Sequence, residues 1–249
     1  MTALEVLFLV GGGVLAGIAG AGAGIASLVS YPVLLATGLS PLIANVTNSV
    51  ALTFTTAGAM AGSRPELRGQ GARVRRFALI AVVGGLTGAV LLLTTPEEVF
   101  AYLVPWLIGG ASIALLLRPW LQRLHANRLH AGHWAVTLGV AIVALYSGYF
   151  GAGAGVLVMA LLGAVIPDSM QRLNALKNTI VGAANTVAAV GFAVFGPVSW
   201  LAVLPLAAGC FVGGLVAPWI VRRIPDTPLR IGVGLLGLGL AIKLGIDAY

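Results

Sequence analysis

The nine residues Gly17-Ile-Ala-Gly20-Ala-Gly-Ala-Gly24-Ile occur again as Gly148-Tyr-Phe-Gly151-Ala-Gly-Ala-Gly155-Val, with six identities at a shift of 131 residues. Farther along, Gly84-Gly85-Leu86 matches Gly213-Gly214-Leu215 at a shift of 129. The order of apolar segments is also repeated: a long segment, a short one and then three more. We therefore predict one domain over residues 1–249, built from two repeats at about 4–117 and 133–248 that the loop 118–132 joins.

The composition around these stretches is that of a membrane protein. Of the 249 residues, 59% are hydrophobic and 8% are charged, and the mean hydropathy is +1.03, whereas a soluble domain has roughly 25% charged residues. Three runs, at 6–63, 129–167 and 178–221, contain no Asp, Glu, Lys or Arg, and each exceeds the ~20 apolar residues that cross a bilayer. The predicted fold is an all-α, polytopic membrane protein, which argues against a soluble enzyme, a disordered chain or a nucleic acid partner.

Two of the apolar segments are too short to cross a bilayer. The segments are 4–23, 25–38, 41–62, 77–94, 98–117, 133–150, 155–166, 171–195, 200–221 and 229–247. As helices, 25–38 and 155–166 span about 18–21 Å, against a hydrocarbon core of about 30 Å. We predict that they are re-entrant or broken helices, whose non-helical backbone must be buried in protein or line a wet cavity. Thr95-Pro96-Glu97-Glu98 is predicted to cap the helix that follows it.

The arginines indicate how the repeats are oriented. They gather in the predicted loops 63–76, 118–132 and 222–230, which should be cytoplasmic because basic loops stay on that side. The connections 95–98 and 196–199 should then face outward, and both termini should lie outside. Equivalent loops of the two repeats lie on opposite sides, so the repeats are inverted. Many secondary transporters have this architecture, with the substrate bound near the bilayer midplane.

The two Gly-rich tips, 20–24 and 151–155, are the first candidate binding elements. Each precedes a short helix, whose N-terminus presents unpaired N–H groups and a partial positive charge. Two tips that meet at mid-membrane would form an anion site, with the candidate residues Gly20, Gly22, Gly24, Gly151, Gly153 and Gly155. Close packing of helices is the alternative explanation, because these glycines also form GxxxG pairs.

Polar residues on the segments 41–62 and 171–195 supply the second set of candidates. At 100° per residue, Asn45 and Asn48 share one face with Ser49, Thr55 and Thr56. The equivalent face of the second segment carries Asn174, Lys177, Asn178 and Asn185. Such polar stripes either hold helices together or line a cavity. For Ser and Thr the first role is favoured, because they can bond their own helix backbone. Lys177 is the only ionisable residue well inside a predicted crossing, and we expect it to attract or bind an anion.

Other kinds of chemistry lack the residues they need. No Asp or Glu lies in a predicted helix interior, so a carboxylate proton relay is missing. The sequence contains one cysteine, Cys210, which is expected to pack in the apolar interior. His125, His130 and His133 cluster in a predicted cytoplasmic loop, where a metal site is not expected. We predict neither an enzyme nor a cofactor, and no metal.

The order of several motifs resembles the sulfite exporter TauE/SafE family of bacterial membrane proteins. The motifs, as they stand in this sequence, are Gly-x-x-Gly-x-Gly-x-Gly at 17–24 and again at 148–155, Gly38-Leu39-Ser40-Pro41, Ala44-Asn45-Val46-Thr47-Asn48 and Gly196-Pro197-Val198-Ser199-Trp200. The resemblance covers essentially the whole chain. The commonest form of the motif has consecutive glycines where Ala21, Ala23, Ala152 and Ala154 stand here, which weakens the transfer of a particular substrate more than that of the fold.

The resemblance implies movement of small anions, especially sulfur oxyanions, across the bacterial inner membrane. We therefore predict a multi-pass secondary transporter that exports sulfite, an organosulfonate or a related anion by alternating access. A passive anion channel built on the same repeats is the alternative, and a structural or assembly role is the third possibility. The expected partners are the anionic substrate and the lipid bilayer, and a homodimer is left open.

Overall fold

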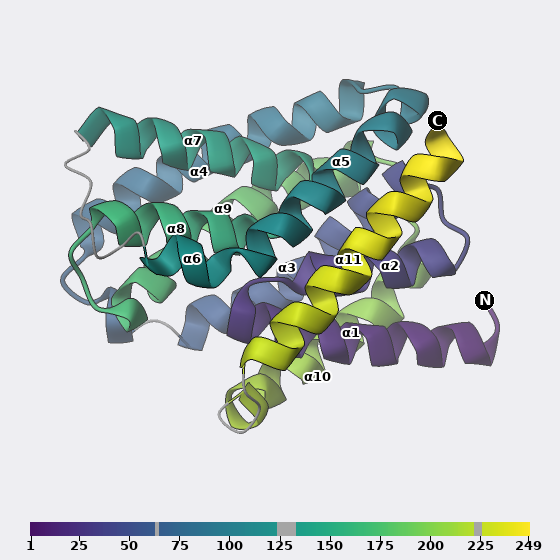
Figure 1. The fold of residues 1–249 in the computed structure, drawn as a ribbon, viewed down its shortest axis with the longest axis horizontal. Helices are drawn as coiled ribbons and strands as arrows, with labels where there is room; N and C mark the ends of the chain where they lie inside the picture. The colour runs from purple at the N-terminus through teal and green to yellow at the C-terminus, as the bar shows by residue number, and fades with distance from the viewer. Residues whose placement is uncertain (63–64, 124–132, 222–225) are drawn as a thin grey trace.

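The computed structural model describes residues 1–62, 65–123, 133–221 and 226–249, which form helices and contain no β-strand (Figure 1). The predicted first repeat contains α1 (Ala3–Ala23), α2 (Ala26–Ala36), α3 (Pro41–Gly62), α4 (Gly71–Thr94) and α5 (Glu97–Leu116). The second comprises α7 (His133–Tyr149), α8 (Ala154–Val165), α9 (Met170–Phe195), α10 (Trp200–Val221) and α11 (Asp226–Ala248). Two short elements, η1 (Pro65–Leu67) and α6 (Arg118–Arg123), lie in predicted loops.

Several helices extend beyond the apolar segments that marked them. α4 begins at Gly71 rather than at residue 77, and α11 begins at Asp226, so Arg73 and Arg230 lie in helices rather than in loops. An apolar run marks the hydrocarbon layer, whereas a helix can continue into the headgroup region, and arginine is a good helix former. Of the other predicted loop residues, 63–64, 124–132 and 222–225 lie outside the described residues.

The predicted cap at Thr95 is wrong. The Thr95 hydroxyl donates to the Leu91 carbonyl at 2.6 Å and so belongs to the end of α4, while Pro96 precedes α5 without a capping side chain. A capping box is instead formed at the start of α1, where the Glu5 N–H donates to the Thr2 hydroxyl at 3.3 Å and the Thr2 N–H donates to the Glu5 carboxylate at 3.0 Å. A threonine hydroxyl can accept from a backbone N–H of the helix that follows it or donate to a carbonyl of the helix that precedes it, so its presence before a helix does not ensure a cap.

The two halves exchange their packing partners. α1 packs on α10 and α7 packs on α4, so the first helix of each half lies against the fourth helix of the other. α3 packs on α9, and α5 on α11, joining equivalent helices. In Figure 1 the α4–α7 pair lies at the top and the α1–α10 pair at the bottom, and both chain termini lie at the same end.

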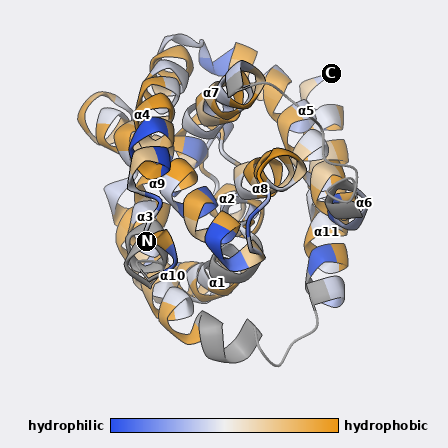
Figure 2. Ribbon diagram, turned by 90° about the vertical axis from the view of Figure 1, so that its left-hand side faces the viewer, coloured by the Kyte–Doolittle hydropathy of each residue, from blue (hydrophilic) through white to orange (hydrophobic). Residues whose placement is uncertain are grey.

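Apolar side chains cover the outside of the bundle, as in a protein that lies in lipid. Viewed along the helices, many outward ribbon faces are hydrophobic (Figure 2), and large exposed residues include Leu79, Trp106, Ile142, Leu204 and Leu236. Within the described residues, five helices are long and apolar enough to cross a membrane: α1, α4, α5, α9 and α11. The protein is therefore a polytopic α-helical membrane protein. α2 and α8, with 11 and 12 residues, are as short as predicted.

Candidate functional site

The first Gly-rich stretch is mostly helical. α1 continues through Gly20 to Ala23, and the chain turns only at Gly24, whose φ is 72°. The Gly24 N–H closes the helix by donating to the Gly20 carbonyl at 3.0 Å, the left-handed C-cap for which glycine is favoured. The predicted tip 20–24 is therefore mostly the last turn of α1, which ends where the predicted segment 4–23 ends, and only Gly24 turns the chain.

The second stretch is irregular over more of its length. α7 ends at Tyr149, and both Gly151 and Gly153 adopt left-handed conformations, with φ of 77° and 71°. α8 begins at Ala154, so Gly155 lies in its first turn. Gly153 also lies against α5, where a Cβ on it would come 3.3 Å from the Cβ of Ala111.

The two turns meet beside Lys177. A Cβ on Gly24 would lie 3.3 Å from the Gly155 Cα and 3.5 Å from the Lys177 Nζ, and a Cβ on Gly155 would lie 3.0 Å from the Gly24 carbonyl oxygen. Glycine at both positions therefore permits the backbones of the two repeats to touch, and it leaves room for the ammonium group of Lys177.

A small cavity opens at this junction. Its volume is about 70 Å³, which corresponds to roughly five water molecules and suits a small solute. Helices from both repeats contribute to it, and its lining comprises Gly20, Gly24, Ala26, Ser27, Leu52, Thr55, Gly151, Gly155, Lys177, Asn178, Val181 and Asn185. Seven of the twelve sequence-derived candidates are in this set: Gly20, Gly24, Gly151, Gly155, Lys177, Asn178 and Asn185.

Lys177 is buried with its charge unbalanced by any described carboxylate. It lies in α9 and is 4% exposed, and the ion pairs among the described residues do not include it. Among the described residues, the charge that bears on Lys177 is that of Arg118, at the start of α6, which has the same sign and so gives it no counter-charge. A buried cation in such surroundings is stabilised by an anion.

Thr55 lines the cavity, whereas the sequence favoured a role in holding helices together for it. It is 8% exposed, and its Oγ1 has no hydrogen-bond partner among the described residues, although the Cys210 thiol lies near it. The sequence signal that could have placed it in the site was its position on the same helix face as Asn45 and Asn48. Ser27, in the first turn of α2, was missed because nothing in the sequence distinguishes it from other helical serines.

Asn185 contributes a donor to the cavity. Its Oδ1 accepts from the Ser147 hydroxyl of α7 at 2.7 Å, which leaves its amide N–H groups for other acceptors. Asn178, one residue after Lys177, lines the cavity as well.

Asn45 and Asn48 hold helices together outside the cavity lining. The Asn45 Nδ2 donates to the Tyr149 carbonyl at the end of α7 at 2.9 Å, and the Asn48 Oδ1 accepts from the Ser30 hydroxyl of α2 at 2.5 Å. Both residues therefore fix the elements that flank the two turns. Asn174 and Gly153 do not line the cavity either, and the surroundings of Gly22 lie outside the described residues.

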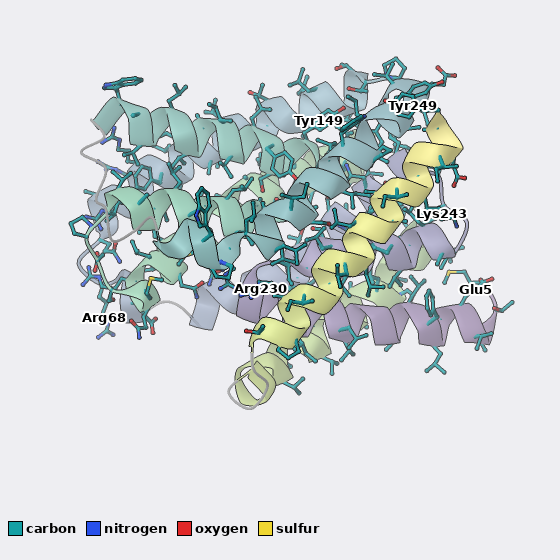
Figure 3. The ribbon with its side chains drawn as sticks, in the orientation of Figure 1. Glu5, Arg68, Tyr149, Arg230, Lys243 and Tyr249 are labelled. Atoms are coloured by element: carbon teal, nitrogen blue, oxygen red, sulfur yellow. The ribbon has the colours of Figure 1, made fainter. Side chains whose placement is uncertain are left out.

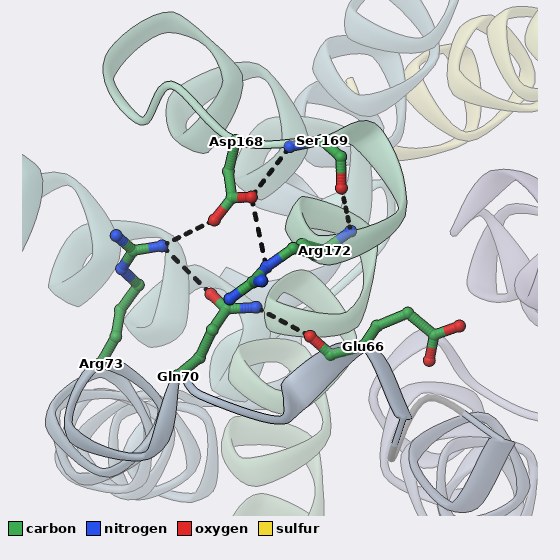
Figure 4. A network of polar contacts seen from close by, with 6 residues as sticks. All are labelled: Glu66, Gln70, Arg73, Asp168, Ser169 and Arg172. Atoms are coloured by element: carbon green, nitrogen blue, oxygen red, sulfur yellow. Dashed lines mark hydrogen bonds and ion pairs between the residues drawn. The ribbon is translucent and has the colours of Figure 1, made fainter.

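An ion-pair network joins the two halves at the end opposite the termini. Asp168, between α8 and α9, accepts from Arg73 of α4 at 3.1 Å and pairs with Arg172 of α9 at 3.2 Å (Figure 4). The Ser169 N–H, which donates to Asp168, and the two guanidinium groups hold the pKa of this carboxyl below its usual value. Figure 3 shows Arg68 at this end and Glu5 and Tyr249 at the other.

Comparisons with known proteins agree with this architecture. The sequence profile of the sulfite exporter TauE/SafE family matches residues 6–244. The chain is 26% identical to a probable membrane transporter protein of Haemophilus influenzae, over 98% of this chain and 95% of that protein. It is 23% identical to the probable membrane transporter protein YfcA of Escherichia coli, over 99% and 91% respectively.

No solved structure matches the chain. The family profile covers nearly all of the sequence, and both relatives are named as probable membrane transporters. The protein is therefore a membrane transporter, and it belongs to the sulfite exporter TauE/SafE family.

Proposed function

We propose that this protein is a secondary transporter that exports a small oxyanion, with sulfite or an organosulfonate as the substrate. The substrate would bind in the cavity where the Gly24 and Gly155 turns meet. The observation that carries this proposal is the buried Lys177 ammonium, which faces that junction without a described carboxylate to balance it.

Electrostatics favour an anion at this position. The N-termini of α2 and α8 lie beside the cavity, and a helix N-terminus carries about half a positive charge. Lys177 adds a full charge, and the side chains of Asn178, Asn185, Ser27 and Thr55 add hydrogen-bonding groups. An oxyanion would neutralise the ammonium and accept these hydrogen bonds at once.

Alternating access would come from rocking of the two repeats around this site. The exchanged pairing of α1 with α10 and of α7 with α4 supports two inverted repeats about a shared centre. The ends differ in how they are closed: ion pairs join Arg73, Asp168 and Arg172 at one end, whereas at the other the Ser199 N–H donates to the Thr47 hydroxyl at 3.0 Å.

The arginine-rich end is the cytoplasmic end in this proposal, which follows the rule for basic segments. Both termini would then be periplasmic, in the inner membrane of a bacterium. The side-chain distribution in Figure 3 supports this orientation, with Arg68 and Glu5 at opposite ends.

Two measurements test the proposal. Purified protein should be stabilised thermally by sulfite or a sulfonate, since a ligand of the folded state raises its stability. Absence of stabilisation by sulfite, sulfonates, thiosulfate and carboxylates would count against an anion site. In proteoliposomes, a carrier exchanges labelled for unlabelled anion in counterflow, whereas flux that follows only the electrochemical gradient would indicate a channel.

A further inference from the structure

We propose that a second cavity, between the first turns of α4 and α7 and the end of α8, binds an anionic phospholipid. The lipid phosphate would lie on Arg73 and Arg76, and an acyl chain would lie against the apolar part of the lining. This site is apart from the cavity at the Gly-rich turns. Lipid binding there requires only that the protein spans a membrane, whatever solute it transports.

The second cavity has a lining of two kinds. Its volume is about 450 Å³, within the range of about 300–1,000 Å³ that is typical of small-ligand sites. α7 contacts both α4 and α8 here, so the cavity joins the two halves of the chain. The basic part of the lining is Arg73 and Arg76 of α4, and the apolar part is Phe77 of α4, Val136 of α7, and Val165 and Ile166 at the end of α8. A pair of guanidinium groups beside an apolar wall suits a phosphate ester that carries a hydrocarbon chain.

The cavity lies at the depth of lipid headgroups. α4 has 24 residues and spans about 36 Å, whereas the hydrocarbon core of a bilayer is about 30 Å thick. Its first turns therefore extend into the headgroup layer. Arg73 and Arg76 lie in these turns, and the part of the helix without a charged residue begins at Phe77. The lining thus changes from basic to apolar in the direction in which a phospholipid changes from phosphate to acyl chain.

Neighbouring side chains hold both guanidinium groups in place. The Arg73 Nη1 donates to the Asp168 carboxylate and to the Gln70 Oε1, each at 3.1 Å (Figure 4). The Arg76 Nη2 donates to the Thr137 hydroxyl of α7. A guanidinium carries five N–H donors in a planar fork that matches phosphate geometry. Two such groups, already positioned at one cavity, lose little conformational entropy when they bind a phosphate.

Positive charge exceeds negative charge around the cavity. Residues 65–76 contain four arginines and one acid, Glu66, and the Asp168 carboxylate is shared between Arg73 and Arg172. The described lining of the cavity has no carboxylate. An anionic headgroup is attracted by this excess, whereas the ammonium group of a zwitterionic headgroup would bring a like charge to the arginines.

The matching helix pair at the other end of the bundle indicates that helix packing does not need these arginines. α1 packs on α10 as α7 packs on α4. α10 nevertheless begins with Trp200-Leu-Ala-Val-Leu-Pro205 and contains no charged residue in its first turns. The same kind of pairing therefore forms without basic side chains, which favours a ligand as the role of Arg73 and Arg76.

Short-chain lipids test the proposal on the full-length protein in detergent. Dioctanoyl phosphatidylglycerol, dioctanoyl phosphatidylethanolamine and glycerol phosphate would be titrated, with the affinity measured by calorimetry and the thermal midpoint recorded in parallel. We expect phosphatidylglycerol to bind at least about tenfold more tightly than either other probe and to raise the thermal midpoint. Phosphatidylethanolamine carries the ammonium group, and glycerol phosphate has no chain to bury against the apolar wall.

Arg76→Gln should weaken the binding of phosphatidylglycerol about fivefold, the effect expected of one basic residue at an anionic lipid. Arg75→Gln is the matched control, because it removes the same charge from the adjacent residue of α4, which is also exposed but does not line the cavity. This control should retain the affinity of the wild-type protein. Arg76→Lys keeps the charge and should bind more tightly than Arg76→Gln.

Equal losses of affinity in Arg75→Gln and Arg76→Gln would overturn the proposal, because the general charge of this end would then explain the binding. Equal affinity of the wild-type protein for phosphatidylglycerol and glycerol phosphate would also overturn it, since the apolar wall would have no role. Equal affinity for the two lipids would contradict the preference for an anionic headgroup. These wild-type comparisons stand even if a variant does not fold, and their failure would leave the proposed function at the Gly-rich turns unaffected.

Discussion

The two Gly-rich turns have the same sequence motif but different backbone conformations. In the first turn α1 stays helical through Gly20 and only Gly24 is left-handed, whereas in the second Gly151 and Gly153 are left-handed and Gly155 is helical. Gly24 and Gly155 are equivalent in the motif, so each turn places a different conformation at the point of contact. The motif therefore permits two conformations, and the surrounding helices decide which one is adopted.

This difference has a consequence for the proposed binding site. A transporter with two inverted repeats is asymmetric in any state that opens to one side only, and glycine tolerates both helical and left-handed backbone at little cost. The glycines of the turns then serve both for close approach and for conformational freedom. The predictions below test these roles separately.

The largest effect should come from removing the charge of Lys177, which lies where the two turns meet. Lys177→Gln should reduce anion transport by about 100-fold, because removing one partner of a buried ion pair costs roughly 2–5 kcal/mol. Counterflow of labelled sulfite in proteoliposomes measures this. Lys243→Gln, at an exposed position in α11, is the control and should retain transport. Undiminished transport by a folded Lys177→Gln variant would show that the cation is not part of the site.

Alanine substitutions at the two contacting glycines should reduce transport to different extents. Gly24→Ala should reduce transport by about tenfold or more, because the new Cβ meets Gly155 and Lys177 in a left-handed backbone that costs L-residues roughly 1–2 kcal/mol. Gly155→Ala should be milder, since its backbone is helical and carries no left-handed strain, although the Gly24 backbone must shift because the new Cβ would lie 3.0 Å from its carbonyl oxygen and 3.2 Å from its Cα.

Gly38→Ala isolates the effect of the backbone conformation. Its φ is 84°, and a Cβ there meets nothing within 4 Å, so the variant should lose some stability while transporting normally. A loss of transport in Gly38→Ala equal to that in Gly24→Ala would mean that strain alone, rather than contact between the turns, explains the effect.

Thr55→Val should weaken anion binding about three- to tenfold without loss of stability, because it removes a buried hydroxyl that has no hydrogen-bond partner among the described residues. Thr179→Val is the comparison. The Thr179 hydroxyl donates to the Ala175 carbonyl at 3.1 Å, so this variant should lose stability and keep its affinity. The thermal midpoint and the calorimetric affinity of both variants would be measured. Destabilisation of the Thr55→Val variant would contradict the claim that the Thr55 hydroxyl does not stabilise the folded protein.

The smallest effect should come from the ion-pair network far from the turns. The pKa of Asp168 is depressed in the folded protein, mainly by the Ser169 N–H, so its stabilising contribution is present above the unfolded pKa and is lost as pH falls through the lower, folded value. Asp168→Asn should lower the Tm at neutral pH by about 1–2 °C, since partly exposed pairs contribute little. The variant should also lose less stability than the wild-type protein as pH falls through the folded pKa of Asp168. An equal fall in Tm for the two proteins would argue against this.

Much of the fold could be predicted because its signals are local. Pro41 and the glycines of the turns mark helix boundaries, and the lengths of α2 and α8 follow from the apolar segments. The 100° periodicity also placed Lys177, Asn178 and Asn185 on a common face, and all three line the same cavity.

The remainder depended on tertiary packing. Asn45 and Asn48 lie on the polar face of α3, yet they pair with Tyr149 and Ser30 rather than lining the cavity. Periodicity gives the angle of a side chain about its helix but does not say which neighbour lies opposite. For the same reason it could not show that the Thr55 hydroxyl has no hydrogen-bond partner among the described residues.

The most direct test of the central claim is an anomalous difference map from crystals soaked with selenate, an oxyanion without a proton that contains an anomalous scatterer. We expect a peak between Gly24 and Gly155, beside the Lys177 ammonium, and no such peak in the Lys177→Gln variant. Selenate bound elsewhere, with this cavity empty at a concentration that saturates binding in solution, would contradict the account.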